Sequence, residues 1–187
     1  MRIEEEHVFP VYIMEKIINK IVGLCKNSKL EIMGQLIGQV YQFQGKKYII
    51  ITDSLFIKGA IHSEKYGTAS VKGALGEFEK RFQEIKEKRG ELNLRRVGWW
   101  HSHPGFTCFL SAIDLQTQKS VFPESHEVAL VVDPVNDYYE FLIREKGYPE
   151  YNARHKACRR LAILSLGVFK SGKKYQPYRR DHLKSEK

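Results

Sequence analysis

The chain has 187 residues and a mass of 21.8 kDa, a size that suits one domain. Apolar residues make up 42% and charged residues 28% of the sequence, close to the globular average, which excludes disorder as its main description. The longest uncharged apolar run, at 161–169, is about half as long as a membrane-spanning helix. Residues 1–7 contain three glutamates and no apolar stretch, so we expect no secretion signal there. Three widely spaced cysteines argue against a disulfide scaffold, so we expect a cytoplasmic protein without a membrane segment.

The net charge of +9 comes from the C-terminal part of the chain. Residues 1–150 hold 20 basic and 20 acidic residues, whereas residues 151–187 hold 11 basic and 2 acidic ones. We therefore expect a neutral domain over 1–150, followed over 151–187 by a basic extension that is helical at 152–166 and then disordered. A neutral domain with a basic tail argues against nucleic-acid binding. Binding of RNA or the ribosome by the tail stays open as the weaker alternative, since aromatic residues alternate there with basic ones.

Hydrophobic periodicity predicts helices and strands that alternate along the first 150 residues. Apolar side chains spaced three and four residues apart indicate a first helix from Pro10 to Asn27, with proline in its first turn. Two β-like runs follow, joined by a typical hairpin turn at 44–46, and residues 57–69 are predicted to form a loop. Further helices are expected over 70–89 and 111–121, and strands over 32–43, 47–56, 96–101, 127–132 and 138–144. This order favours an α/β or α+β fold around one sheet.

Two histidines at the end of a predicted strand carry the clearest chemical signal. His101 and His103 are two residues apart, a spacing that places both imidazoles on the same face of a strand. Ser111 and Asp114 have the spacing of a capping box, which puts the aspartate in the first turn of the next helix. Two imidazoles and one carboxylate, with a fourth position left for water, form the ligand set of a catalytic zinc ion. From these residues alone a second interpretation stays open, in which the histidines are packed polar residues and Asp114 is only a helix cap.

The sequence around these residues resembles the JAMM (MPN+) motif of zinc-dependent isopeptidases. The motif consists of His101-Ser-His103-Pro, six further residues and Ser111-x-x-Asp114. The segment 97–106 is most similar to the branch of the family that contains the proteasome-lid deubiquitinases and the COP9-signalosome deneddylases. Glu31, followed by Ile-Met-Gly-Gln-Leu-Ile-Gly, and the run 128–134 also resemble segments of this family. The similarity extends over residues 8–144.

The resemblance implies a fold and a catalytic apparatus. The fold is a single MPN domain (JAMM, cytidine-deaminase-like), with a central mixed β-sheet flanked by helices. One Zn²⁺ per chain, with a bound catalytic water, is expected to be held by His101, His103 and Asp114. Glu31 is expected to accept the proton of that water and pass it to the leaving amine. Ser111 is expected to stabilise the oxyanion that forms at the scissile carbonyl.

The resemblance also implies a substrate. The expected reaction is hydrolysis of the isopeptide bond between the C-terminal glycine of ubiquitin, or of a ubiquitin-like modifier, and a substrate lysine. Trp100 and Phe106 are expected to border a narrow channel for this tail, and residues 57–69 fall where the family carries an insertion that pairs with it. The short chain after residue 144 is typical of a compact, archaeal-type form that acts alone as a monomer or with a proteasome. Two alternatives stay open: a JAMM peptidase for a different small modifier, and a non-catalytic MPN interaction module.

Overall fold

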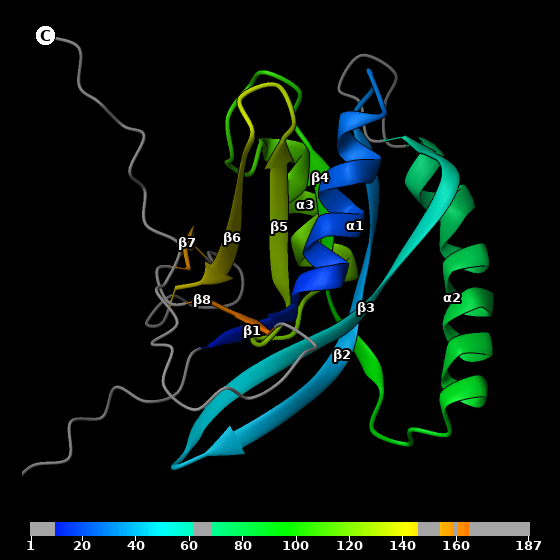
Figure 1. The fold of residues 1–187 in the computed structure, drawn as a ribbon, viewed down its shortest axis with the longest axis vertical. Helices are drawn as coiled ribbons and strands as arrows, with labels where there is room; N and C mark the ends of the chain where they lie inside the picture. The colour runs from blue at the N-terminus through cyan, green and yellow to red at the C-terminus, as the bar shows by residue number, and fades with distance from the viewer. Residues whose placement is uncertain (1–9, 62–68, 146–153, 159–160, 165–187) are drawn as a thin grey trace, which may run out of the picture.

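A mixed β-sheet forms the centre of the protein (Figure 1). The structure is a computed structural model that describes residues 10–61, 69–145, 154–158 and 161–164. Eight strands in these ranges form one sheet in the order β7-β6-β5-β4-β2-β3-β1-β8. The strands are β1 (Val11–Met14), β2 (Ile32–Phe43), β3 (Lys46–Ile61), β4 (Arg95–Ser102), β5 (Val128–Asp133), β6 (Tyr138–Arg144), β7 (His155–Ala157) and β8 (Leu161–Leu164). The helices of the same ranges are α1 (Glu15–Lys26), α2 (Ala69–Arg89) and α3 (Ala112–Val121).

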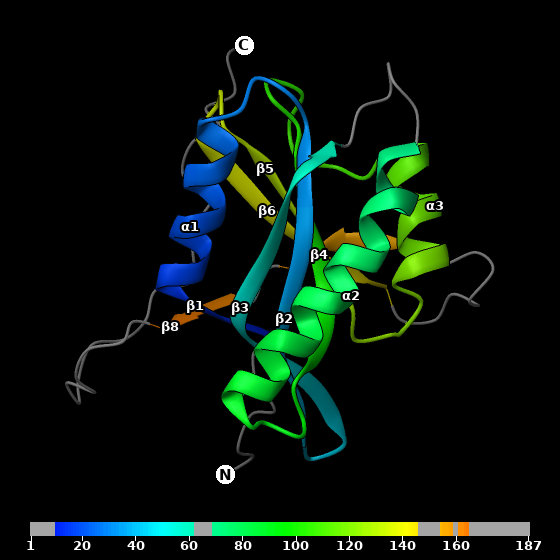
Figure 2. The same ribbon diagram turned by 90° about the vertical axis from the view of Figure 1, so that its right-hand side faces the viewer.

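Helices cover both faces of this sheet. Figure 2 shows α1 on one face and α2 with α3 on the other. The core on the α1 face contains Ile21, Leu36 and Trp100, and the core on the opposite face contains Phe78 and Trp99. The fold is therefore an α/β domain with a mixed sheet flanked by helices, which confirms the predicted fold class. Among the described residues, the helices are too short or too polar to cross a membrane.

Side chains along β4 alternate between the two cores, and this alternation positions the site. Strand geometry sends successive side chains to opposite faces. Trp99 and His101 point to the face covered by α2 and α3, whereas Trp100 points to the α1 face. On one side β4 pairs antiparallel with β2, where Met33 lies opposite His101, and on the other side parallel with β5, where Val131 lies opposite His101. His101 is therefore held in the middle of the sheet, near the C-terminal end of β4.

Two predicted segments in the first half of the chain differ from the structure. Residues 11–14 form β1 rather than the start of a helix, because their backbone pairs with both β3 and β8, and α1 begins only at Glu15. The loop predicted over 57–69 is wrong at its start, since residues 57–61 continue β3 and extend its pairing with β2. Residues 62–68 lie outside the described part of the chain.

The last two described strands lie at opposite edges of the sheet. β7 pairs with β6 and β8 pairs with β1, so the helix predicted over 152–166 is wrong where the structure describes it. Only three residues separate Ala157 from Leu161, which limits the distance between the two strands to about 14 Å. A flat sheet of eight strands is about 33 Å wide, so this sheet is curled and its edges approach each other. The domain boundary at residue 150 remains a prediction.

Candidate active site

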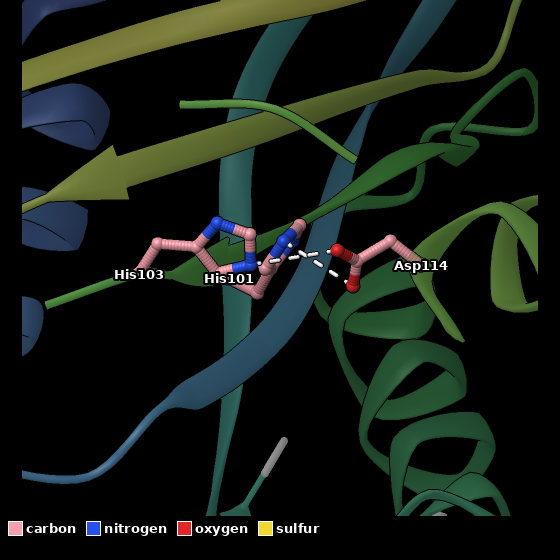
Figure 3. A group of neighbouring side chains, drawn as sticks. All are labelled: His101, His103 and Asp114. Carbon is pink, nitrogen blue, oxygen red and sulfur yellow. Dashed lines mark ion pairs between the residues drawn. The ribbon is translucent and has the colours of Figure 1, made fainter. Parts of the chain in front are cut away.

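Three side chains from β4, the residues after it and α3 meet at the C-terminal end of β4 (Figure 3). The Nε2 atom of His101 lies 3.4 Å from Oδ1 of Asp114, and Nε2 of His103 lies 3.4 Å from Oδ2. One ligand atom from each residue lies within 4.8 Å of the other two, and all three residues are buried. The two imidazole planes meet at 72°, with centroids 4.7 Å apart. The structure therefore brings together the three residues predicted as metal ligands.

The local backbone holds each of these side chains in place. The N–H of His103 donates to the carbonyl of Val132 on β5 at 2.8 Å, so the chain stays attached to the sheet just after β4 ends. Asp114 lies in the first turn of α3, where it forms a capping box with Ser111. Its Oδ2 accepts the Ser111 N–H at 2.7 Å, and its own N–H donates to the Ser111 Oγ at 3.3 Å. The helix cap thus fixes the direction of the carboxylate.

The spacing and chemistry of these atoms fit a zinc ion. Two ligand atoms bound at about 2.0–2.1 Å in a tetrahedral site lie about 3.3–3.4 Å apart. The imidazole of His101 lies at such a distance, 3.4 Å, from one carboxylate oxygen of Asp114, and the imidazole of His103 lies 3.4 Å from the other oxygen. Two imidazoles and a carboxylate are also a donor set that catalytic zinc sites use. The three predicted ligands therefore lie close enough together to share one metal ion, and their chemistry suits zinc.

The charges around His103 favour a cation at this position. Burial by itself lowers the pKa of His103, but the hydrogen bond and the charge of Asp114, the charge of Glu31 and the backbone of Thr107 together raise it above its usual value of 6.5. The same negative charges attract a metal cation. The electrostatics of the site therefore agree with the geometry of its ligand atoms.

Glu31 lies beside the same cluster, just before β2. The N–H of Ile32 donates to the Oγ of Ser102 at 3.0 Å, one residue beyond the pair formed by Met33 and His101. Continued by one more residue, this antiparallel register brings Glu31 opposite His103, with both side chains on the α2/α3 face. The charge of Glu31 acts on His103, which agrees with this placement. Glu31 is half-buried, so it lies between the buried cluster and the protein surface.

The two residues predicted to border a substrate channel lie in different surroundings. Trp100 is fully buried on the α1 face, with its ring centroid 5.8 Å from that of Phe56. This position does not support a substrate contact by Trp100, because the alternation of β4 turns its side chain away from the metal ligands. Phe106 is 66% exposed in the turn after His103, whose carbonyl accepts the Phe106 N–H at 3.2 Å. A substrate contact by Phe106 remains a prediction.

Exposed apolar side chains lie beside the buried residues that could hold a metal. The ring of Phe109 packs against that of His103 with centroids 5.0 Å apart, yet Phe109 is 47% exposed. Leu115 follows Asp114 on α3 and is also exposed. Exposed apolar surface beside buried polar ligands is typical of a site that binds another molecule.

Sequence reasoning missed Asp133, whose carboxylate organises the loop after His103. Its Oδ1 accepts the N–H of Gly105 at 2.9 Å, and its Oδ2 accepts the N–H of Thr107 at 3.0 Å. On the other side, the backbone and the side-chain amide of Asn136 donate to the same carboxylate at 3.2 and 2.7 Å. Burial by itself raises the pKa of Asp133, but these hydrogen bonds hold it below its usual range. An aspartate at a strand end directly before proline was the available signal, since such residues cap turns.

Comparison with known protein families agrees with the fold and the site. The family model described as JAB1/Mov34/MPN/PAD-1 ubiquitin protease matches residues 7–125. This range includes Glu31, Ser111 and the three residues that can hold a metal. The chain therefore belongs to the JAB1/Mov34/MPN/PAD-1 family, as the motif predicted.

Relatives of the chain include proteins of two yeasts. The COP9 signalosome complex subunit 5 of Candida glabrata is 32% identical over 140 residues, which cover 67% of this chain and 28% of that protein. The 26S proteasome regulatory subunit RPN11 of the same yeast is 34% identical over 107 residues, or 57% of this chain and 32% of that protein. The ubiquitin carboxyl-terminal hydrolase RPN11 of Saccharomyces cerevisiae is 60% identical over 40 residues, or 21% of this chain and 13% of that protein. The chain thus matches about a third or less of the length of these relatives.

Proposed function

We propose that the protein is a zinc-dependent isopeptidase. It hydrolyses the bond between the C-terminal glycine of ubiquitin, or of a ubiquitin-like modifier, and a substrate lysine. The observation that carries this proposal is the buried cluster of His101, His103 and Asp114 with Glu31 beside it. The substrate class is supported by the family, whose model is described as a ubiquitin protease, and by a relative named as a ubiquitin carboxyl-terminal hydrolase.

His101, His103 and Asp114 are the residues that would hold the zinc ion. Bound there, zinc supplies Lewis acidity, which lowers the pKa of a coordinated water toward about 7 and polarises the scissile carbonyl. The ligands are buried, and electrostatic interactions in such low-dielectric surroundings are stronger than in bulk water. The protein's own contribution is to hold these ligands in place through β4 and the cap of α3.

Glu31 is the proposed proton carrier. Its carboxylate accepts a proton from the attacking water and later donates it to the lysine amine that leaves, so one side chain acts first as base and then as acid. Two features of its position suit this role. It continues the β2 register opposite His103, and it is half-buried, between the buried cluster and the protein surface.

Ser111 is the proposed donor to the oxyanion. Its Oγ accepts the N–H of Asp114, so the hydroxyl hydrogen is directed elsewhere and can reach a substrate oxygen. Phe106 and Phe109 would contact the extended tail of the modifier on its way to the ligands. Glycines at the end of that tail suit a narrow passage because they have no side chains.

The test is cleavage of a ubiquitin–lysine isopeptide conjugate by the zinc-loaded protein. Glu31→Gln should abolish cleavage and keep the bound zinc, because it removes the proton carrier and no metal ligand. Glu84→Gln, on the exposed surface of α2, is the matched control and should cleave at the wild-type rate. A chelator should stop cleavage, and added zinc should restore it.

Other outcomes separate the alternatives. If zinc-loaded protein cleaves a conjugate of a different small modifier but not of ubiquitin, the proposed reaction stands and the proposed substrate changes to that modifier. Protein that binds zinc and cleaves neither conjugate would favour a non-catalytic MPN interaction module.

A protein assembly related to the proteasome is the proposed partner. This proposal is supported by relatives named as subunits of the 26S proteasome and of the COP9 signalosome complex. Co-purification with an intact assembly, compared with the size of the isolated protein in solution, would test both the partner and the expected monomer. The cytoplasmic location and the pairing of residues 57–69 with the modifier remain predictions.

A further inference from the structure

A stack of aromatic rings continues from the metal ligands into the core. The indole of Trp99 lies almost parallel to the imidazole of His101, with centroids 4.4 Å apart and planes at 14°. Trp99 also stacks on Phe122, with centroids 5.9 Å apart and planes at 6°. All three residues are buried. The plane of the His101 imidazole, and thus the direction of its Nε2, therefore follows the plane of the Trp99 indole.

Gln118 fixes that indole from the side of α3. Its Oε1 accepts the N–H of Trp99 at 2.7 Å, and its Nε2 donates to the carbonyl of Phe122 at 2.8 Å. An indole nitrogen can only donate, so Trp99 determines which end of the amide faces it. Gln118 is buried, and both ends of its side chain are used. The position of the indole ring is thereby set by two stacking contacts and one hydrogen bond at its edge.

The same residue also fixes α3 relative to β4. Gln118 comes four residues after Asp114, so both side chains lie on one face of the helix. Asp114 reaches His101 near the start of α3, and Gln118 reaches Trp99 one turn later. Two side chains on one face of α3 thus contact two side chains on one face of β4. A change at the second contact would alter the geometry of the first.

We propose that Gln118 and Trp99 are positioning residues for the metal site. The hydrogen bond between them fixes the ring plane of His101 and the distance of Asp114 from it. This inference rests on the zinc site of the proposed function, but not on its substrate. Groups that support metal ligands from outside commonly change metal affinity by about 10–100-fold when they are removed.

Gln118→Met tests the proposal, because methionine keeps the approximate length of the side chain and loses its hydrogen bonds to Trp99, Phe122 and Glu127. Zinc affinity is measured by competition with a chromogenic chelator, and we expect it to fall at least about tenfold. The absorption bands of bound Co²⁺, which report the arrangement of the ligands, should shift in the same variant. Gln116→Met, at an exposed position of α3, is the matched control and should leave both readouts unchanged.

A double variant separates positioning from a general loss of stability. Trp99→Phe combined with Gln118→Met removes donor and acceptor together, so much of the stability lost in Gln118→Met should return. Because the link between α3 and β4 is still absent, zinc affinity should stay low. Affinity that recovers together with stability would overturn the proposal. Wild-type zinc affinity and an unchanged Co²⁺ spectrum in Gln118→Met would also overturn it.

The failure of the proposed function gives a different result. Wild-type protein that binds zinc and cleaves no conjugate would contradict the proposed reaction, while the affinity comparison would still decide the role of Gln118. Wild-type protein that binds neither Zn²⁺ nor Co²⁺ would overturn both proposals.

Discussion

Gly34 on β2 lies directly opposite Trp100 on β4, and a methyl group at position 34 would lie 2.5 Å from the indole ring. The same methyl group would also collide with the backbone carbonyl of Leu55 on β3. β2 is therefore held between its two neighbours at a distance that only glycine permits. This close approach explains why the strand that follows Glu31 carries glycine at this position.

Gly34→Ala should accordingly destabilise the protein by about 2–3 kcal/mol, since neither the backbone of β3 nor the buried indole can yield without shifting its neighbours. Urea unfolding at pH 7 measures the change. Gly23→Ala is the matched control, because a methyl group at position 23 in α1 would meet no atom within 4 Å. That variant should gain about 0.5–1 kcal/mol from the higher helix propensity of alanine. Equal stabilities of the two variants would contradict the close packing of β2.

Zinc should stabilise the folded chain. At a free zinc concentration about 1,000 times the dissociation constant, binding to the native state alone adds about 4 kcal/mol to the free energy of unfolding. His103→Ala removes one ligand, so the zinc-dependent increase in its free energy of unfolding should be mostly lost. The measurement is chemical unfolding with zinc present and again after zinc is removed by a chelator. His126→Ala, which lies after α3 and outside the cluster, should retain this increase. An undiminished gain in His103→Ala would mean that zinc binds elsewhere.

Glu127 should make stability depend on pH. Burial raises the pKa of its carboxyl from 4.5 to about 7, even though the N–H of Glu124 donates to it. Between these two values the folded protein keeps a proton that the unfolded chain releases, so stability should fall by up to about 3 kcal/mol as pH rises through this window. Glu127→Gln should remove this fall and be more stable than wild type at pH 8. Glu84→Gln, on the exposed surface of α2, should show the wild-type pH profile.

Asp133 should have the opposite dependence. Burial raises the pKa of Asp133, but the hydrogen bonds outweigh burial and hold this pKa low. The carboxylate therefore contributes its full stabilisation above the unfolded-state pKa of about 4, and this stabilisation is lost as pH falls through the pKa of the folded state. Asp133→Asn should lower stability by about 3 kcal/mol at pH 7, because an amide presents N–H groups to backbone donors. The difference from wild type should shrink toward pH 3 in unfolding experiments. Asp137→Asn, in the same turn but exposed, should change stability by less than about 1 kcal/mol.

The features predicted correctly from sequence are those that depend on neighbours along the chain. β2 has the predicted bounds because apolar residues and a hairpin turn define it locally. His101 and His103 share a face because strand geometry alone determines it. The same rule places Trp99 on that face and Trp100 on the other, so the direction of the Trp100 side chain also follows from the sequence.

The features predicted wrongly depend on partners far away in sequence. Val11 in β1 is extended because it pairs with Ile49 and with Leu161, and the residues around it have a pattern that suits a helix equally well. The four apolar residues of β8 are similarly ambiguous until β1 is present beside them. The role of Asp133 was also hidden, since its donors come from two loops whose approach depends on the pairing of β5 with β4 and β6.

The pairing of β1 with β8 has a consequence for synthesis on the ribosome. β1 leaves the exit tunnel before the other described strands, but its outer neighbour β8 emerges about 150 residues later. When the first 150 residues have left the tunnel, β1 therefore exposes one open edge, with backbone groups that can pair with other chains. The metal ligands and both neighbours of β4 are already outside at that stage. During translation the cluster of His101, His103 and Asp114 can thus assemble while the edge of β1 that later pairs with β8 is still unprotected.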